Sequence, residues 1–448
     1  YPNTLKRWRT LEEKRDLPVK IDYLRPGSAN YPAKTDYSYD ILGRPVTKKD
    51  YFNAPAPDLT HTYAYDDRNE LVSDAMSRGG TYSYSYDNIG NRKTSLEGTD
   101  SLPTTYVANR VNQYTDITEG EEVPFVPNYD ADGNQTKLRT ATGEWEASYN
   151  ALNQAVNFIQ GDRRIECVYD YLNRRVEKSV YEGESLMSRK RFIYHGYLQI
   201  AELDATEVLE SVVPVLRKTY LWDPLEPVAT RILAMGVFDE TGVYVEDLYY
   251  THDALKNTTA LFGIKAGRRA LYEYGPYGSA VKMEGNAAEL NPFRFSSEYA
   301  DDELGLVYYN YRYYNPQNGR WISRDPMTEK ESCLLYGYVN NMPTLYSDEL
   351  GLACTITTNK DDCSINVSLN IVIYPKGGDS INNIEMRTTA QRIKQSIESN
   401  WNGYEKGCCV VNVTADVSVQ SRKSRWLYRF LNSDENNIEI TSDSSHRS

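Results

Sequence analysis

Few residues of this chain have the side chains and spacing that catalysis or metal binding requires. Histidine occurs four times in 448 residues, at His61, His195, His252 and His446. There is no His-Glu-x-x-His segment, and only one histidine follows residue 352. Because a zinc site of the common type needs several histidine or cysteine ligands at set spacings, the sequence predicts no metal site and no cofactor.

The cysteines give no metal or redox motif either. They are Cys167, Cys333, Cys354, Cys363, Cys408 and Cys409. No Cys-x-x-Cys spacing occurs among them, and adjacent cysteines in a strand point to opposite faces. We expect buried free thiols, which is the usual state of cysteine in a folded domain. Disulfides among the last four cysteines are the alternative.

Composition indicates a mainly β protein. The chain has 39 Tyr and only 9 Phe, and tyrosine favours strands because it buries a ring while keeping its hydroxyl hydrated. The mean hydropathy is -0.64, and no apolar run approaches the length of about 18 residues that a membrane span needs. The first residue is Tyr and no signal peptide is visible, so we expect an excerpt or a processed piece.

Charge is unevenly distributed. Residues 353–448 hold 11 Lys+Arg and 11 Asp+Glu, so residues 1–352 carry the whole net charge of -13. An acidic surface repels phosphates, which argues against nucleic-acid binding by residues 1–352.

A repeat occupies the first part of the chain. Its unit is a Tyr-x-Tyr-Asp strand end followed by a turn that contains Gly or Asn. Copies lie at residues 37–44, 63–69, 82–92, 129–134, 149–153 and 168–174, with divergent copies at 220–224 and 272–278. The two tyrosines share one face of a strand, Asp accepts backbone N–H bonds in the turn, and Gly or Asn reverses the chain.

Each unit is therefore predicted to be a hairpin that becomes stable only when it is stacked on its neighbours. In the last copy, Gly275 occupies the position that Asp usually has. The Tyr-Asp pairs could instead bind sugars by stacking and carboxylate contacts. The architectural interpretation is favoured because the spacing follows hairpin geometry.

Residues 292–352 form a second recognisable segment. It contains Phe293-Arg294-Phe295, the run Tyr308 to Tyr314, and Gly319-Arg320-Trp321. This segment resembles the Rhs-repeat-associated core, and the repeats resemble the YD repeats of Rhs, Tc-toxin and teneurin proteins. The resemblance implies a hollow β-shell, closed by the core segment and followed by a variable C-terminal effector.

The resemblance also implies a self-cleavage site at the end of the core. Arg324, Asp325 and Asp348 match the family's aspartyl autoprotease motifs, and the bond cut would be Leu352–Ala353. Two neighbouring carboxyls cannot both ionise, so one would activate water while the other donates a proton.

The chain departs from the motifs at two positions, having Thr328 for Gly and Glu349 for Pro. Glu349 would add negative charge beside the two aspartates, and loss of Pro would loosen the turn. The alternative is that Asp325 and Asp348 are ordinary turn residues.

Residues 353–448 have a different pattern. Apolar residues alternate over 365–374 and over 409–419, which predicts two strands, and a strand is possible over 437–441. Met386, Ile393, Ile397 and Trp401 fall on one helical face between them. A β-α-β order predicts a small α/β domain. It bears a weak resemblance to the N-terminal half of zincin metallopeptidases, although the zinc-binding helix would have to lie further on.

The sequence thus predicts three parts: a repeat array over 1–290, a core over 291–352 and a variable, incomplete effector domain over 353–448. The predicted function is that of an Rhs-type toxin carrier, secreted or at the bacterial cell surface. Its expected partners are its own preceding shell repeats, a cognate immunity protein and a secretion machinery. A cell-surface adhesin or carbohydrate-binding protein is the first alternative, and a zinc metallopeptidase toxin is the second.

Overall fold

A computed structural model describes most of the first 351 residues and five strands beyond them. The described ranges are 1–24, 32–52, 55–206, 213–224, 231–265, 267–326, 334–348, 350–351, 357–359, 364–375, 404–406, 409–419 and 438–440. The chain divides into two compact units. The first comprises Tyr1–Arg324 with Leu334–Gly351, and the second comprises Asp325–Cys333 with Leu352–Ser448.

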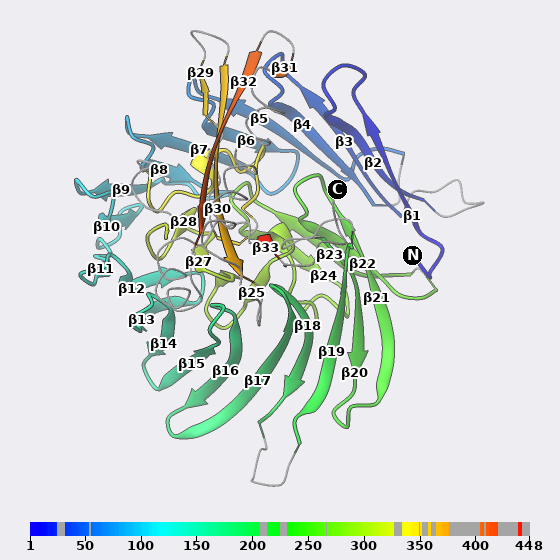
Figure 1. Cartoon of the computed structure of the whole chain (residues 1–448), viewed down its shortest axis with the longest axis vertical. Coiled ribbons are helices and arrows are strands. Elements are labelled where there is room, and N and C mark those ends of the chain that lie inside the picture. Colours follow the sequence, from blue (N-terminus) through cyan, green and yellow to red (C-terminus); the bar gives the residue numbers. More distant parts are fainter. Residues whose placement is uncertain are drawn as a thin grey trace. The chain divides into compact units, whose positions relative to one another are not determined.

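Two long antiparallel sheets, here called the wall, make up most of the first unit (Figure 1). The ten strands of the first sheet are β1 Lys6–Leu11, β2 Pro18–Leu24, β3 Ala33–Tyr39, β4 Pro45–Tyr51, β5 Leu59–Tyr65, β6 Leu71–Met76, β7 Thr81–Tyr86, β8 Arg92–Leu96, β9 Thr104–Ala108 and β10 Tyr114–Glu119. Each strand pairs with its neighbours in sequence, so the sheet is a continuous meander of hairpins.

The second wall sheet has fourteen strands in the same sequential order. They are β11 Asn128–Tyr129, β12 Gln135–Thr140, β13 Gly143–Tyr149, β14 Ala155–Gln160, β15 Arg163–Tyr169, β16 Arg175–Glu182, β17 Ser185–His195, β18 Leu198–Asp204, β19 Val215–Trp222, β20 Ile232–Phe238, β21 Tyr244–His252, β22 Thr258–Phe262, β23 Arg268–Tyr274 and β24 Ala280–Glu284.

A small third sheet, here called the plug, contains β25 Tyr299–Asp301, β26 Leu306–Tyr309, β27 Arg312–Asn315 and β28 Arg320–Trp321. Alternate side chains of the plug enter different hydrophobic clusters. Tyr308 and Tyr313 pack with residues of the second wall sheet. Tyr309 and Tyr314 pack with residues of the first wall sheet. The plug is therefore buried between the two wall sheets, as the period of two along a strand allows.

The only helical segments in the described residues are two short 3-10 turns, Phe295–Ser297 and Val339–Asn341. The prediction of a mainly β shell part is confirmed. No helix among the described residues has the length and apolar character that crossing a membrane requires.

The predicted role of Asp in the turns is confirmed. Strands β3, β5, β7, β13 and β15 end at the tyrosine before each turn residue. In the turn after β7, Asp87 Oδ1 accepts hydrogen bonds from the N–H groups of Ile89 and Asn91, each at 2.9 Å. Gly90 adopts a φ of +90°, which suits glycine. The copy at Gly275 keeps its turn through a backbone bond from Gly275 N–H to the Ser279 carbonyl.

The last tyrosine of each repeat ties neighbouring units together. Its hydroxyl donates to the carbonyl that opens an earlier strand: Tyr39 to Pro18, Tyr65 to Pro45, Tyr86 to Leu71, Tyr149 to Gln135 and Tyr169 to Ala155. These contacts occupy both members of the Tyr-Asp pair inside the sheet. The contacts therefore support the architectural interpretation of the motif over sugar binding.

Removing one turn carboxylate tests this interpretation. Asp87→Ala is expected to destabilise the first unit by about 1–3 kcal/mol because two N–H groups lose their acceptor. Asp87→Asn is expected to cost much less, since Asn150 accepts the equivalent bonds from Leu152 and Gln154. Thermal unfolding measures both variants. Equal losses from Ala and Asn would contradict a role as hydrogen-bond acceptor.

A buried ionic network fastens the plug to the second wall sheet. Asp301 of β25 pairs with Arg175 and Lys178 of β16, and Lys178 also binds Glu303 at 2.8 Å. The side chains of Arg175, Lys178 and Asp301 are almost completely buried. Glu202 of β18 joins the same region, because it accepts a hydrogen bond from the Tyr299 hydroxyl at 3.3 Å.

The network predicts acid sensitivity. Burial opposes ionisation of Glu202, but Lys218 and Lys190 outweigh it and lower the pKa of this carboxyl to about 2. Against the same effect of burial, Lys178 and Lys190 lower the pKa of Glu303 to about 2. A lowered folded-state pKa gives stability that is complete above the ordinary value of 4.5 and is lost as the pH falls toward 2.

We therefore expect the melting temperature to fall between pH 4.5 and 2, and to fall less steeply in Glu202→Gln. Melting curves over this pH range check the expectation. Parallel curves for the two proteins would show that Glu202 does not contribute.

The second unit contains a separate sheet. Its strands are β29 Thr357–Asn359, β30 Ser364–Pro375, β31 Tyr404–Lys406, β32 Cys409–Val419 and β33 Ile438–Ile440. β30 runs parallel to β32 and to β33. A parallel pair needs a crossover, as in a β-α-β unit, so the pairing agrees with the predicted order. The predicted helical face from Met386 to Trp401 lies outside the described residues.

Candidate functional site

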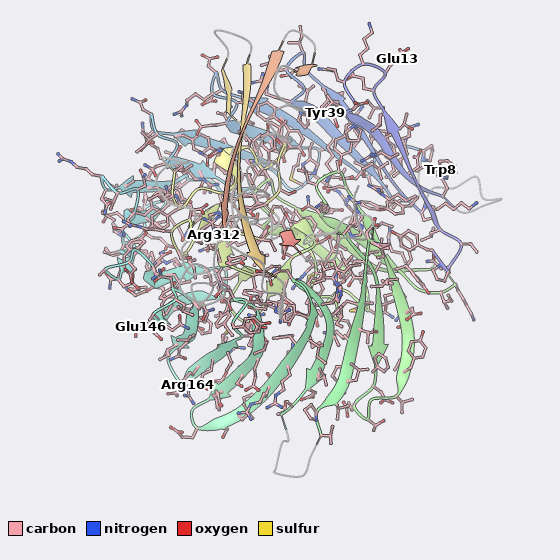
Figure 2. The ribbon with its side chains drawn as sticks, viewed as in Figure 1. Trp8, Glu13, Tyr39, Glu146, Arg164 and Arg312 are labelled. Atoms are coloured by element: carbon pink, nitrogen blue, oxygen red, sulfur yellow. The ribbon has the colours of Figure 1, made fainter. Side chains whose placement is uncertain are left out.

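The predicted cleavage junction is described at Asp348, Leu350 and Gly351. These residues end the first unit, and they lie next to the hairpin of β26 and β27. Arg312 begins β27, and its guanidinium stacks on the Trp321 ring at 4.1 Å. Its Nη2 lies 3.5 Å from Asp348 Oδ2, and both side chains are buried. Its Nε donates to the Gly351 carbonyl. Arg312 is labelled in Figure 2 among the side chains of the first unit.

Asp348 organises the turn that leads to residue 352. Its Oδ1 accepts hydrogen bonds from the N–H groups of Gly351 at 2.8 Å and Leu350 at 3.2 Å. The Leu350 carbonyl accepts a bond from Tyr311 N–H at 3.1 Å. Gly351 has a φ of +79°, and a Cβ there would lie 3.2 Å from Tyr309 Cβ. Glycine therefore fits both the backbone conformation and the space at this position.

Tyr338 also stabilises the turn that contains Asp348. Its hydroxyl accepts the backbone N–H of Asp348 and lies within hydrogen-bond distance of Tyr309 and Ser296. Burial raises the pKa of Tyr338 well above its usual value, so the phenol stays neutral. The turn is thus anchored by backbone and side-chain bonds to the plug.

This environment favours one protonation state of Asp348. Two N–H donors and a guanidinium stabilise a carboxylate more than a carboxylic acid. A role of this carboxylate as general base stays a prediction.

The other predicted residues are placed separately. Arg324 is half-buried in the first unit, and its Nε is a buried atom without a hydrogen-bond partner among the described residues. A Cβ on Gly133 would lie 2.5 Å from this nitrogen, so Arg324 packs against the turn before β12. Asp325 is half-buried and belongs to the second unit. The approach of Asp325 to Asp348 therefore stays a prediction.

Four residues named for the junction lie outside the described residues: Thr328, Glu349, Leu352 and Ala353. Arg312 was missed by the sequence reasoning. Its signal is a single cation within the run of tyrosines from Tyr308 to Tyr314, because a buried charge needs a counter-ion.

The buried histidines and the buried cysteine of the first unit lie in environments typical of residues with a structural role. His61 Nδ1 lies 2.7 Å from Asp74 Oδ2, and both residues are buried. Burial, with Arg231 and Arg7, lowers the pKa of His252 well below its usual value. Cys167 is a buried free thiol, as expected. Within the part of the chain that the structure describes, no group of three or more candidate ligands could hold a metal ion.

Comparisons with known proteins agree with this architecture. Residues 33–344 match the family model described as Teneurin YD-shell. The tRNA nuclease WapA of Bacillus subtilis (strain 168) is 28% identical over 303 residues, which cover 64% of this chain and 12% of that protein. Double-stranded DNA deaminase toxin A of Burkholderia cenocepacia (strain H111) is 24% identical over 354 residues, covering 70% of this chain and 24% of that protein.

A solved structure shares the fold. The crystal structure of TcdB2-TccC3 matches with a TM-score of 0.63 at 20% identity, over 79% of this chain and 19% of the other. The chain spans no more than about a quarter of the length of any of these three proteins. The family model covers well over half of the chain, so this chain belongs to the Teneurin YD-shell family of Rhs/YD-repeat proteins.

Proposed function

We propose that the chain is part of a toxin-carrier shell, in which residues 353–448 begin an effector released by cleavage of the Leu352–Ala353 bond. The observation that carries this proposal is the buried Asp348, held beside Arg312 four residues before the bond. The relatives support a carrier of variable cargo, because the names of two of them specify different toxic activities, a tRNA nuclease and a DNA deaminase.

The proposed cleavage assigns opposite roles to the two aspartates. Asp348, as the carboxylate, removes a proton from water, and the water oxygen adds to the carbonyl carbon of Leu352. Asp325, as the carboxylic acid, donates its proton to the amide nitrogen of Ala353. The C–N bond then breaks to give a carboxylic acid and an amine. Arg312 holds Asp348 ionised, and the anchored Gly351 turn presents the bond.

The proposed setting follows from the carrier role. Such a protein acts outside the cell that makes it, secreted or at the cell surface. It works with preceding repeats of its own shell, a cognate immunity protein and a secretion machinery. The adhesin alternative is less well supported, because the Tyr-Asp pairs are engaged within the sheet. The metallopeptidase alternative requires a His-Glu-x-x-His segment, which does not occur in residues 1–448.

Sequences of the same gene from related bacterial strains test the carrier role. A carrier of exchangeable effectors is expected to keep residues up to about Leu352 and to vary after it. A tail shared by all strains would instead favour the adhesin. Intact-mass measurement of the purified chain tests cleavage separately.

A further inference from the structure

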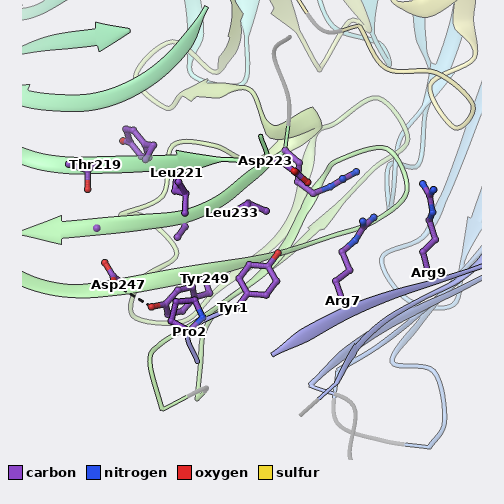
Figure 3. Close-up of a pocket in the computed structure, with 14 residues that line it drawn as sticks. Tyr1, Pro2, Arg7, Arg9, Thr219, Leu221, Asp223, Leu233, Asp247 and Tyr249 are labelled. Carbon is purple, nitrogen blue, oxygen red and sulfur yellow. Dashed lines mark hydrogen bonds between the residues drawn. The ribbon is translucent and has the colours of Figure 1, made fainter. Parts of the chain in front are cut away.

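A trough crosses three wall strands, β19, β20 and β21 (Figure 3). Cross-strand partners form two rows along it, Thr219–Gly236–Asp247 and Leu221–Ala234–Tyr249. In these two rows the central strand contributes only Gly236 and Ala234, while both flanking strands contribute larger side chains; Leu233 of β20 also lines the pocket. The floor of the trough is therefore low along β20.

Gly236 lies in the floor of the trough, where the surrounding space admits no larger side chain. A Cβ on Gly236 would lie 2.6 Å from Thr219 Oγ1 and 3.5 Å from Asp247 Oδ1. Glycine within a strand often marks a position that another group approaches closely. Leu221 beside it is 60% exposed, so an apolar surface is left uncovered on the trough wall.

Strand β1 supplies a basic side to the trough. Arg7 and Arg9 are two residues apart, so they lie on the same face of β1, and both line the pocket. Figure 3 shows both arginines extending from β1, and it shows Tyr1 next to strands of the second wall sheet. The pocket is open to solvent and has a volume of about 540 Å³, which is within the usual size range of small-ligand sites.

Two donor atoms in this pocket lack an acceptor in the part of the chain that the structure describes. Arg7 Nε and the Tyr1 hydroxyl are buried without a hydrogen-bond partner among the described residues. In the same part of the chain, neither Arg7 nor Arg9 forms an ion pair with a carboxylate. A buried donor without a partner is destabilising, so a ligand that accepts these bonds would be stabilised.

The charges in the pocket favour an anion. Three arginines, Arg7, Arg9 and Arg231, outnumber the two acids Asp223 and Asp247. Asp247 accepts a hydrogen bond from the Tyr249 hydroxyl at 3.3 Å, at the end of the trough. The basic side and the apolar floor together call for a ligand with one anionic head and an apolar body.

We propose that this trough binds an apolar carboxylate, with its head at Arg7 and Arg9 and its body along Ala234 and Leu221. The same chemistry occurs in a free alkyl carboxylate and in a peptide that ends in a leucine carboxylate. These sources differ only in what is attached to the carboxylate.

Calorimetric titration of the full chain tests the proposal. The probes are decanoate, used below its micelle-forming concentration, and the peptide N-acetyl-Leu-Leu-Leu with a free carboxylate. Decyltrimethylammonium and the C-terminally amidated peptide are matched probes without the anion. Either carboxylate is expected to bind, and the matched probes are not. Binding of one carboxylate but not the other would support the site and identify the source.

Variants localise the binding. The double change Arg7→Gln and Arg9→Gln is expected to weaken binding about tenfold or more, through loss of charge-assisted hydrogen bonds. Ala234→Phe is expected to abolish it by filling the trough. Arg164→Gln is the matched control, because Arg164 is an arginine of β15 that pairs with Glu166 and does not line the trough.

The proposal is overturned if neither carboxylate binds, if the cationic probe binds as well as decanoate, or if binding is unchanged in both sets of trough variants. Melting temperatures are compared first, so that a misfolded variant is recognised. The two arginine changes lie on β1, where Arg7 is half-buried and Arg9 is exposed, so they provide a test that does not depend on Ala234→Phe folding.

Discussion

Asp348→Asn is expected to leave the Leu352–Ala353 bond uncut, whereas the unchanged chain separates there into two fragments. Asparagine keeps the size of the side chain and one oxygen to accept the Gly351 N–H. It cannot take a proton from water, so the general base is lost. Loss of general acid–base catalysis typically slows a reaction by about 10²–10⁴-fold.

Asp325→Asn is expected to have the same outcome for the opposite reason, since it removes the proton donor. Intact-mass spectrometry of the purified chain measures both variants, by the appearance of a fragment that begins at Ala353. Asp132→Asn is the matched control, because Asp132 is exposed in the turn between β11 and β12.

Glu349→Pro separates a weakened reaction from an absent one. Proline would stiffen the turn after Asp348 and remove a neighbouring negative charge. We expect faster cleavage in this variant than in the unchanged chain. If both proteins stay whole, Asp325 and Asp348 are structural residues, and the tail remains covalently attached.

The sequence predicts the hairpins well because their signals are local. A tyrosine that ends a strand, the next residue as acceptor and a Gly or Asn with positive φ lie within a few residues of one another. The turn after β7 shows all three, at Tyr86, Asp87 and Gly90. Local chemistry therefore determines local structure here, and even Gly275 keeps its turn through backbone bonds.

Contacts between segments that are far apart in the sequence could not be predicted from such local signals. Arg312 and Asp348 are 36 positions apart, and the hairpin that brings them together is specified by packing of the plug. Asp301 meets Arg175 and Lys178 across more than 120 positions. Nothing in the spacing of these residues predicts their pairing, because it depends on how the plug lies between the wall sheets.

That pairing leads to the largest expected loss of stability, in Asp301→Asn. The change leaves the buried cations Arg175 and Lys178 without their shared counter-ion. Breaking a buried ion pair by removing one partner typically costs about 3–5 kcal/mol. The melting temperature of the full chain measures the loss. Glu166→Gln is the control, since its pair with Arg164 is well exposed and is expected to contribute about 0–1 kcal/mol.

A triple change distinguishes an uncompensated charge from lost packing. If Arg175→Met, Lys178→Met and Asp301→Leu are combined, no buried ion remains among the three residues. Apolar replacement of a buried ionic group is often neutral or stabilising. Glu303 loses its Lys178 partner in this variant, so the triple variant should recover part of the stability that Asp301→Asn loses. If the triple variant is less stable than Asp301→Asn, the network contributes through its own bonds. If Asp301→Asn unfolds no more easily than Glu166→Gln, the plug is held by its tyrosines alone.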